Sequence, residues 1–134
     1  TKPHQKVNSS DALKEIVHNA KYGKDNPVVV KALIKVVIDD ISYEIFCTQD
    51  YISYLKDNIK RLEKAEKYYN KMKQSKTEEK QNYFREYAKM YLDKNEDIDN
   101  LENLKQEYID SYKMRKEKIE NLYKEINIIK KLKV

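Results

Sequence analysis

The sequence predicts an all-α protein, an antiparallel bundle of four or five helices with a long C-terminal helix. Glycine occurs once and proline twice in 134 residues, which is too few for the closely spaced turns of a β-sandwich or a barrel. Charged residues make up 38% of the chain, as expected of helices that expose one face to water. Apolar residues recur at steps of three, four and seven, which is the spacing of a helix face.

The length fits one domain with a modest core. We expect residues 1–9 to form a flexible N-terminal arm and residues 10–134 to form a single helical-bundle domain. The chain begins with Thr1 and not with methionine, so we expect a fragment of a longer protein or a processed form.

The first helix is expected directly after this arm. Ser9 and Ser10 are suitable N-caps, and a short amphipathic stripe follows at Ala12, Leu13, Ile16, Val17 and Ala20. Gly23 is placed to end this helix as a C′ residue. Pro27, after Asp25 and Asn26, then predicts the first position of the next helix.

Residues 28–47 allow two interpretations. As a helix, the segment is apolar on most sides, with Leu33, Val37, Ile41 and Ile45 along one face. As strands, it forms a short β-hairpin around residues 33–47, which makes the protein α+β. That hairpin lacks the glycine of a type I′ turn, and an isolated two-stranded unit is only marginally stable. The helix is favoured.

Two further helices precede the last one. Thr48 is a suitable cap for a helix that continues to Met72, and residues 75–78 match the capping-box pattern. The helix after this box extends to Leu92, and one side of it carries Phe84, Tyr87, Ala88 and Tyr91. The polar residues 93–99 predict a short connection. Short links favour antiparallel packing of successive helices.

The last helix, residues 97–134, has the most regular pattern. Its apolar stripe consists of Ile98, Leu101, Tyr108, Tyr112, Ile119, Leu122, Ile126 and Ile129. Lys105 and Arg115 occupy two slots of the stripe, where their apolar stems can pack while their charged ends reach water. Such a stripe needs partner helices from this chain or another.

The net charge of +5 originates at the C-terminal end. Residues 113–134 carry eight basic and three acidic side chains, and the other residues carry twenty of each. These cations can complement the helix dipole and keep the helix hydrated, or they can bind a polyanion or an acidic partner. The candidate binding residues are Lys113, Arg115, Lys116, Lys118, Lys124, Lys130, Lys131 and Lys133.

Several candidate catalytic or metal-binding groups are interpreted as chance patterns. Glu15 and His18 match one half of a di-iron motif whose second half is absent. The acidic run of residues 93–99 lacks the glycine and the final glutamate of an EF-hand. Asp39, Asp40 and Glu44 have no further acid or base tied to them by spacing. We therefore expect no metal, no cofactor and no enzymatic activity.

The single cysteine, Cys47, excludes an internal disulfide and favours an intracellular, cytoplasmic location. Cys47 could form a nucleophile–base pair with His18, but a buried apolar role is favoured because cysteine is among the most buried residue types.

The tyrosines allow two roles. Tyr83, Phe84, Tyr87 and Tyr91 lie near Lys80, Arg85 and Lys89, and aromatic residues interleaved with basic ones can stack on single-stranded bases. The same spacing is that of a core-facing stripe, where each ring is buried with its hydroxyl at the surface. Packing is favoured.

Together these patterns predict a non-catalytic helical protein–protein interaction module, a scaffold or adaptor that binds another protein through an amphipathic helix face. A homodimer through the same stripe is a further possibility. The alternative is a basic regulator that binds nucleic acid through the lysine-rich C-terminal helix. A third possibility is that the same residues bind an anionic membrane surface.

Overall fold

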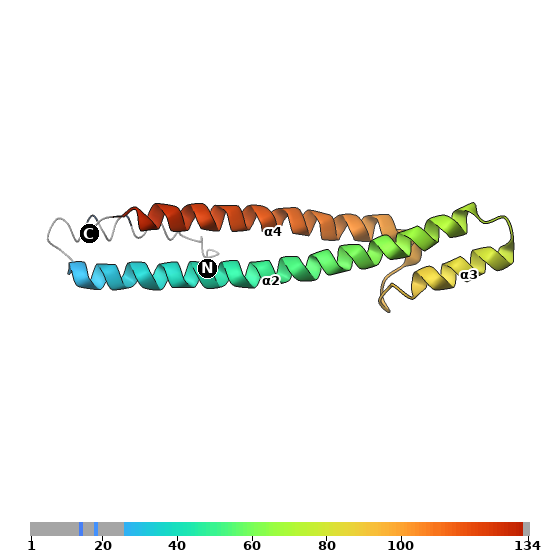
Figure 1. Ribbon diagram of the computed structural model, residues 1–134, viewed down its shortest axis with the longest axis horizontal. Coiled ribbons are helices and arrows are strands. Elements are labelled where there is room, and N and C mark those ends of the chain that lie inside the picture. Colours follow the sequence, from blue (N-terminus) through green and yellow to red (C-terminus); the bar gives the residue numbers. More distant parts are fainter. Residues whose placement is uncertain (1–13, 15–17, 19–25, 133–134) are drawn as a thin grey trace, which may run out of the picture. The chain divides into compact units, whose positions relative to one another are not determined.

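The structure is a computed structural model that describes residues 14, 18 and 26–132. It is all-α, and its elements are helix α2 (Pro27–Gln74), helix α3 (Glu78–Lys89), the 3-10 turn η1 (Ile98–Asn100) and helix α4 (Leu101–Lys130) (Figure 1). No strand occurs within the described ranges, so the hairpin alternative for residues 33–47 is wrong. The predicted arm and first helix lie outside the described residues, except for Lys14 and His18, which are helical and exposed.

Helix α2 joins two segments that the sequence analysis separated at Thr48. Thr48 is 6% exposed, and its hydroxyl donates a hydrogen bond of 2.8 Å to the carbonyl oxygen of Glu44, four residues earlier. A threonine can satisfy its hydroxyl in this way inside a helix, and α2 contains no glycine or proline after Pro27 to break it. Over residues 26–132 the chain therefore has three α-helices in place of the four that the sequence analysis expected there.

The helix ends follow local hydrogen bonds. Pro27 is the first residue of α2, as predicted, and Asn26 caps the helix because its Oδ1 accepts from the Val28 N–H at 2.9 Å. Thr77, and not Ser75, is the N-cap of α3, and its hydroxyl accepts from the Lys80 N–H. Ser75 instead donates to the Lys71 carbonyl in the last turn of α2, so the predicted capping box begins two residues too early.

The chain divides into two compact units, which we describe separately. In unit 1, the described residues are 26–49 and 117–132, and α2 and α4 run antiparallel there. The buried core is aliphatic and consists of Ile41, Ile45, Leu122, Ile126 and Ile129, with Ile34, Val37, Ile38, Ile119 and Leu132 packed against it. At the edge of this core, Lys118 forms a 2.9 Å ion pair with Glu44.

Unit 2 is Asp50–Lys116 and contains the second half of α2, all of α3, and η1 with the start of α4. Its buried residues are Leu62, Ala65, Ala88, Ile98 and Leu101, with Tyr68, Tyr69, Tyr91, Leu92, Leu104 and Tyr108 packed against them. Residues at the end of α2 face the start of α3, so these two helices form an antiparallel hairpin, as predicted (Figure 1).

The apolar stripe of the last helix is confirmed. Every residue of the predicted stripe is buried or half-buried, including the two polar slots at Lys105 and Arg115. The helix itself begins at Leu101, after the 3-10 turn that contains the buried Ile98.

Candidate interaction surfaces

In unit 1, helix α2 exposes a second apolar face opposite its core face. We call it the outer face, and it consists of Val28, Val29, Leu33, Val36, Tyr43 and Phe46, whose exposed fractions are 41–74%. The helix period of 3.6 residues places these positions on the side away from Ile41 and Ile45. The sequence analysis recognised that this segment is apolar on most sides, and the described part of unit 1 covers only one side.

Two carboxylates flank the middle of the outer face. Asp39 and Asp40 are exposed, and their helical positions fall on either side of the line from Val36 to Tyr43. Cys47 lies one turn beyond Tyr43 and is exposed, so the expectation of a buried cysteine is wrong. A hydrogen bond with the Cys47 side chain raises the pKa of the Tyr43 phenol above its ordinary value.

In unit 2, Arg61 fixes the connection between α3 and α4. Its guanidinium donates to the Tyr91 carbonyl at 2.6 Å, to Glu96 at 2.6 and 3.2 Å and to the Asn58 side chain at 2.9 Å. The Glu96 side chain is 11% exposed, and the hydrogen bond from Arg61 is the main reason that its pKa lies below the ordinary value. Glu96 also accepts from the backbone N–H of Asp93 at 2.7 Å. We interpret this group as structural.

The two polar slots of the α4 stripe have different surroundings. Lys105 forms a 3.2 Å ion pair with Glu66 on α2. The Arg115 guanidinium carbon lies 4.9 Å from the ring centre of Tyr51, and its Nε is buried without a hydrogen-bond partner. Both charged ends therefore interact with α2, although the sequence analysis expected them to reach water.

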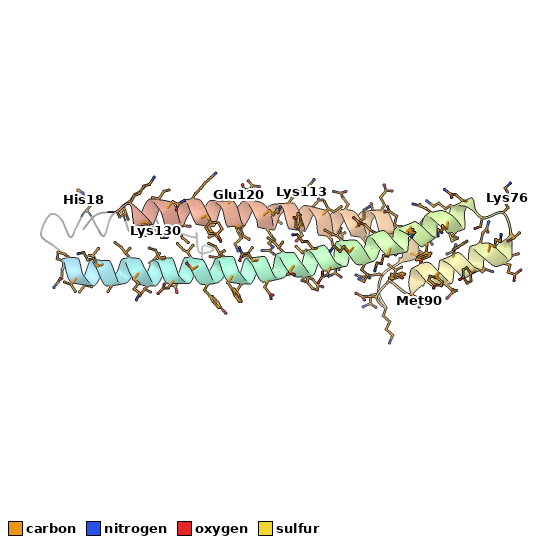
Figure 2. The ribbon with its side chains drawn as sticks, viewed as in Figure 1. His18, Lys76, Met90, Lys113, Glu120 and Lys130 are labelled. Carbon is orange, nitrogen blue, oxygen red and sulfur yellow. The ribbon has the colours of Figure 1, made fainter. Side chains whose placement is uncertain are left out.

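The predicted basic surface of α4 is not a uniform patch. The described lysines at 113, 116, 124, 130 and 131 are exposed, and Figure 2 shows Lys113 on the side of α4 away from α2. Arg115 and Lys118 are used in the contacts with Tyr51 and Glu44. A hydrogen bond from Lys116 lowers the pKa of Tyr112. Lys133 lies outside the described residues.

Acidic side chains also interrupt the exposed side of α4. Glu117 and Glu120 are exposed and lie within one turn of Lys113, Lys116 and Lys124, on the same side of the helix. Alternating charges of this kind are typical of a hydrated helix face.

A second surface, which we call the aromatic–lysine surface, lies where α2 and α3 pack together in unit 2. Tyr68 of α2 has its ring centre 4.7 Å from Tyr87 and 5.9 Å from Tyr91, and Tyr83 is 5.6 Å from Tyr87. Phe84 lies 5.3 Å from Tyr83. The packing role predicted for the stripe on α3 is confirmed for Phe84, Tyr87 and Tyr91, which are half-buried. Tyr83, the fourth residue of that stripe, is 59% exposed.

Lysines surround these rings. Lys64 lies 5.9 Å from the ring centre of Tyr91, and Lys71 lies 5.4 Å from that of Tyr68. A hollow of about 520 Å³ follows between the end of α2 and the start of α3, and it is lined by Lys71, Gln74, Ser75, Lys76, Thr77, Lys80, Tyr83 and Phe84. Figure 2 shows Lys76 on the loop that joins the two helices.

The sequence analysis missed the basic part of this surface. Five exposed lysines recur along α2 at steps of four, four, three and four; they are Lys56, Lys60, Lys64, Lys67 and Lys71. This spacing places them on one helix face, and it is visible in the sequence. The count of charges over the whole chain concealed it, because acids between these lysines and elsewhere balance them.

Several of the acidic residues singled out as metal-site candidates take part in caps and ion pairs in the part of the chain that the structure describes. Within residues 14, 18 and 26–132, no group of three or more histidine, cysteine, aspartate or glutamate side chains could hold a metal ion. Asp97 caps the turn η1, Asp93 lies 3.6 Å from Arg61, and Glu44 pairs with Lys118. Glu15 lies outside the described residues.

Comparison of the chain with protein-family models, with curated proteins and with solved structures found no match. Among the described helices, none has both the length and the apolar composition needed to cross a membrane.

Proposed function

We propose that the protein is a non-catalytic helical interaction module, a scaffold or adaptor whose outer face binds an amphipathic helix of another protein. The outer face carries this proposal. Contiguous exposed apolar side chains on one helix face are typical of protein interaction sites, whereas scattered ones are normal on any surface.

The shape of the outer face favours a helix as the partner. Val29, Val36 and Tyr43 follow each other at steps of seven, and Leu33 and Phe46 broaden the line on either side. A partner helix with apolar residues at steps of three and four can interdigitate with such a row. A helix face without a deep cavity offers little to a small molecule.

The charges of the outer face favour a different protein over a second copy of this chain. Asp39 and Asp40 flank the apolar line at its middle, so a partner with lysine or arginine at that level gains a complementary contact. In a parallel pair of identical chains the same carboxylates would oppose one another, which is unfavourable. We therefore expect a partner helix that is apolar on one face and basic near its centre.

Cys47 permits a direct test, because this exposed thiol lies next to the outer face. The full chain carries a benzophenone label on Cys47 and is irradiated in a lysate of its source cells. We expect an adduct with another protein that has an amphipathic, basic helix. The purified partner should keep most of its affinity at high salt, since the apolar contact does not depend on screened charges, and should lose only the part that the pairs with Asp39 and Asp40 contribute.

Two matched variants decide the outcome. Replacing Val36, Tyr43 and Phe46 together by serine should abolish the adduct, whereas replacing Met90 and Met114 by serine should leave it unchanged. Met90 and Met114 are 76% and 63% exposed and lie outside the outer face.

An adduct of two identical chains would establish a homodimer instead. An adduct that disappears after nuclease treatment, or in a variant with Lys116, Lys124 and Lys131 replaced by glutamate, would favour the nucleic-acid alternative.

A further inference from the structure

We propose that the aromatic–lysine surface of unit 2 binds single-stranded nucleic acid, with phosphates against its lysines and a base stacked on its exposed ring, Tyr83. This surface is separate from the outer face of α2 and from the C-terminal basic residues. The nucleic-acid proposal can therefore fail or succeed independently of the proposed binding of a protein partner to the outer face.

Lysines form a line of positive charge beside the rings, with one exposed carboxylate, Glu63, at its edge. Lys64, Lys67 and Lys71 follow one face of α2, and Lys76 and Lys80 continue around the hollow. All five are exposed, and none of them forms one of the ion pairs found among the described residues. Successive lysines on one helix face are about one turn apart, or roughly 5.4 Å. A charged line of this kind can follow a phosphate backbone.

The aromatic rings lie within the same surface. Lys71 is 5.4 Å from the ring centre of Tyr68 and 6.0 Å from that of Phe84, so one ammonium group is adjacent to rings from both helices. Tyr83 exposes 59% of its area and leaves a ring on which a base can stack. Proteins that bind single strands without sequence preference combine these two features, a positive surface and aromatic stacking positions.

The hollow between α2 and α3 has a lining suited to a phosphate and a base. Its volume of about 520 Å³ lies within the range of roughly 300–1,000 Å³ that is usual for small organic ligands. Three lysines and two aromatic rings line it, together with Ser75 and Thr77, and no carboxylate does. A phosphate and an attached base can therefore be accommodated side by side.

A single strand fits these features better than a duplex. Bases in a duplex are stacked on each other and cannot stack on Tyr83, whereas an unpaired base can. The neighbouring lysines alone would also attract a duplex or another polyanion, because contacts with phosphates are largely independent of sequence. The contribution of the rings is therefore the decisive part of the proposal.

Fluorescence anisotropy with the full chain and a labelled fifteen-nucleotide oligo(dT) tests the phosphate contacts. If three to five phosphates are neutralised, the logarithm of the association constant should fall with the logarithm of salt concentration with a slope of about −2 to −3.5. Replacing Lys71, Lys76 and Lys80 by glutamate should weaken binding by at least about tenfold. The matched control replaces Lys113, Lys116 and Lys124 by glutamate, the same change in charge, and should weaken binding much less.

Single tyrosine variants test the stacking. Tyr83→Ala should weaken binding by about five- to 150-fold, the range measured for loss of one stacked base, and Tyr83→Phe should retain it because the ring remains. Tyr123→Ala, at a tyrosine that is 48% exposed elsewhere, is the control. Quenching of tyrosine fluorescence in the unmodified chain on addition of oligo(dT) provides a measurement that does not depend on any variant.

Three results would overturn the proposal. The first is the absence of oligo(dT) binding at low salt. The second is that heparin or a blunt duplex binds as tightly as oligo(dT) and that Tyr83→Ala has no effect. The third is an equal loss of affinity in the two triple-lysine variants. The last result would indicate attraction by net charge alone.

Discussion

The two units use the same helix α2 in opposite ways. In unit 1 the core is aliphatic, and α2 is apolar both toward α4 and on its outer face. In unit 2 the buried core includes two alanines, tyrosines pack against it, a third helix packs against α2, and the exposed row of α2 carries lysines. Isoleucine and valine cannot form polar contacts at a surface, whereas tyrosine and lysine can be buried in part and remain hydrated at their ends.

This difference explains why the two candidate surfaces have different chemistry. The described part of unit 1 leaves an apolar face that another apolar face can cover. Unit 2 covers its own core with α3, and its remaining surface suits a charged ligand that presents flat rings. Four stability experiments can break or sharpen the comparison.

The largest effect is expected from truncation of the two cores. Leu62 is 1% exposed and Ile45 is 5% exposed, so replacement of either by alanine should lower the free energy of unfolding by about 2–5 kcal/mol. Leu62→Ala should cost more, because Ala65 and Ala88 beside it are too small to fill the cavity. Ile45 has larger aliphatic neighbours that can relax into the space. Urea unfolding followed by circular dichroism measures both values, and the reverse order would contradict this comparison of the cores.

A smaller effect is expected at the ion pair that fixes the connection in unit 2. Arg61→Leu removes every hydrogen bond that its guanidinium donates to Glu96 and to the Tyr91 carbonyl. We expect a loss of about 2–3 kcal/mol, because a mostly buried carboxylate is left without its partner.

The same pair predicts a dependence on pH. The pKa of Glu96 is lower in the folded chain than its ordinary value of 4.5, so the folded state binds this proton less readily than the unfolded state. The stabilisation is present above about pH 4.5 and is lost as the pH falls through the lower folded pKa. Glu96→Gln should therefore flatten the decline in stability in acid. Glu86→Gln, at a side chain that is 73% exposed, should leave the decline unchanged, and equal slopes for both variants would contradict the assignment.

The smallest effect is expected at Arg115. Arg115→Leu removes the contact with Tyr51 but also removes a buried Nε that has no hydrogen-bond partner. These contributions oppose one another, so we expect a change of less than about 1 kcal/mol in either direction. Thermal and urea unfolding of Arg115→Leu and Arg61→Leu under the same conditions would compare the contributions of the two arginines to stability. A loss as large as that of Arg61→Leu would mean that the guanidinium of Arg115 is essential to the packing of α4.

Much of the fold could be predicted from the spacing of apolar residues. The stripe from Ile98 to Ile129 is buried as expected, and Pro27 marks the start of α2. The break predicted at Thr48 is wrong because a threonine that suits an N-cap can also satisfy its hydroxyl within a helix. Local sequence does not distinguish these two roles when no glycine or proline is nearby.

Other features depend on contacts between distant residues. Arg61 and Glu96 are 35 residues apart, and no local pattern pairs them. The exposure of Cys47 depends on which side of an apolar helix is covered, which composition alone does not specify. The lysine row of α2 was accessible to sequence reasoning, because its steps of three and four are regular, but a test of helical periodicity restricted to apolar residues does not find it.

The tyrosine cluster of unit 2 has a practical consequence for spectroscopy. The chain has twelve tyrosines and no tryptophan, so its near-ultraviolet signal comes from phenol rings, several of which are in mutual contact. A single Phe84→Trp substitution would introduce the sole indole of the molecule beside the hollow. Its emission could then report local hydration at that one place against a background free of other indoles.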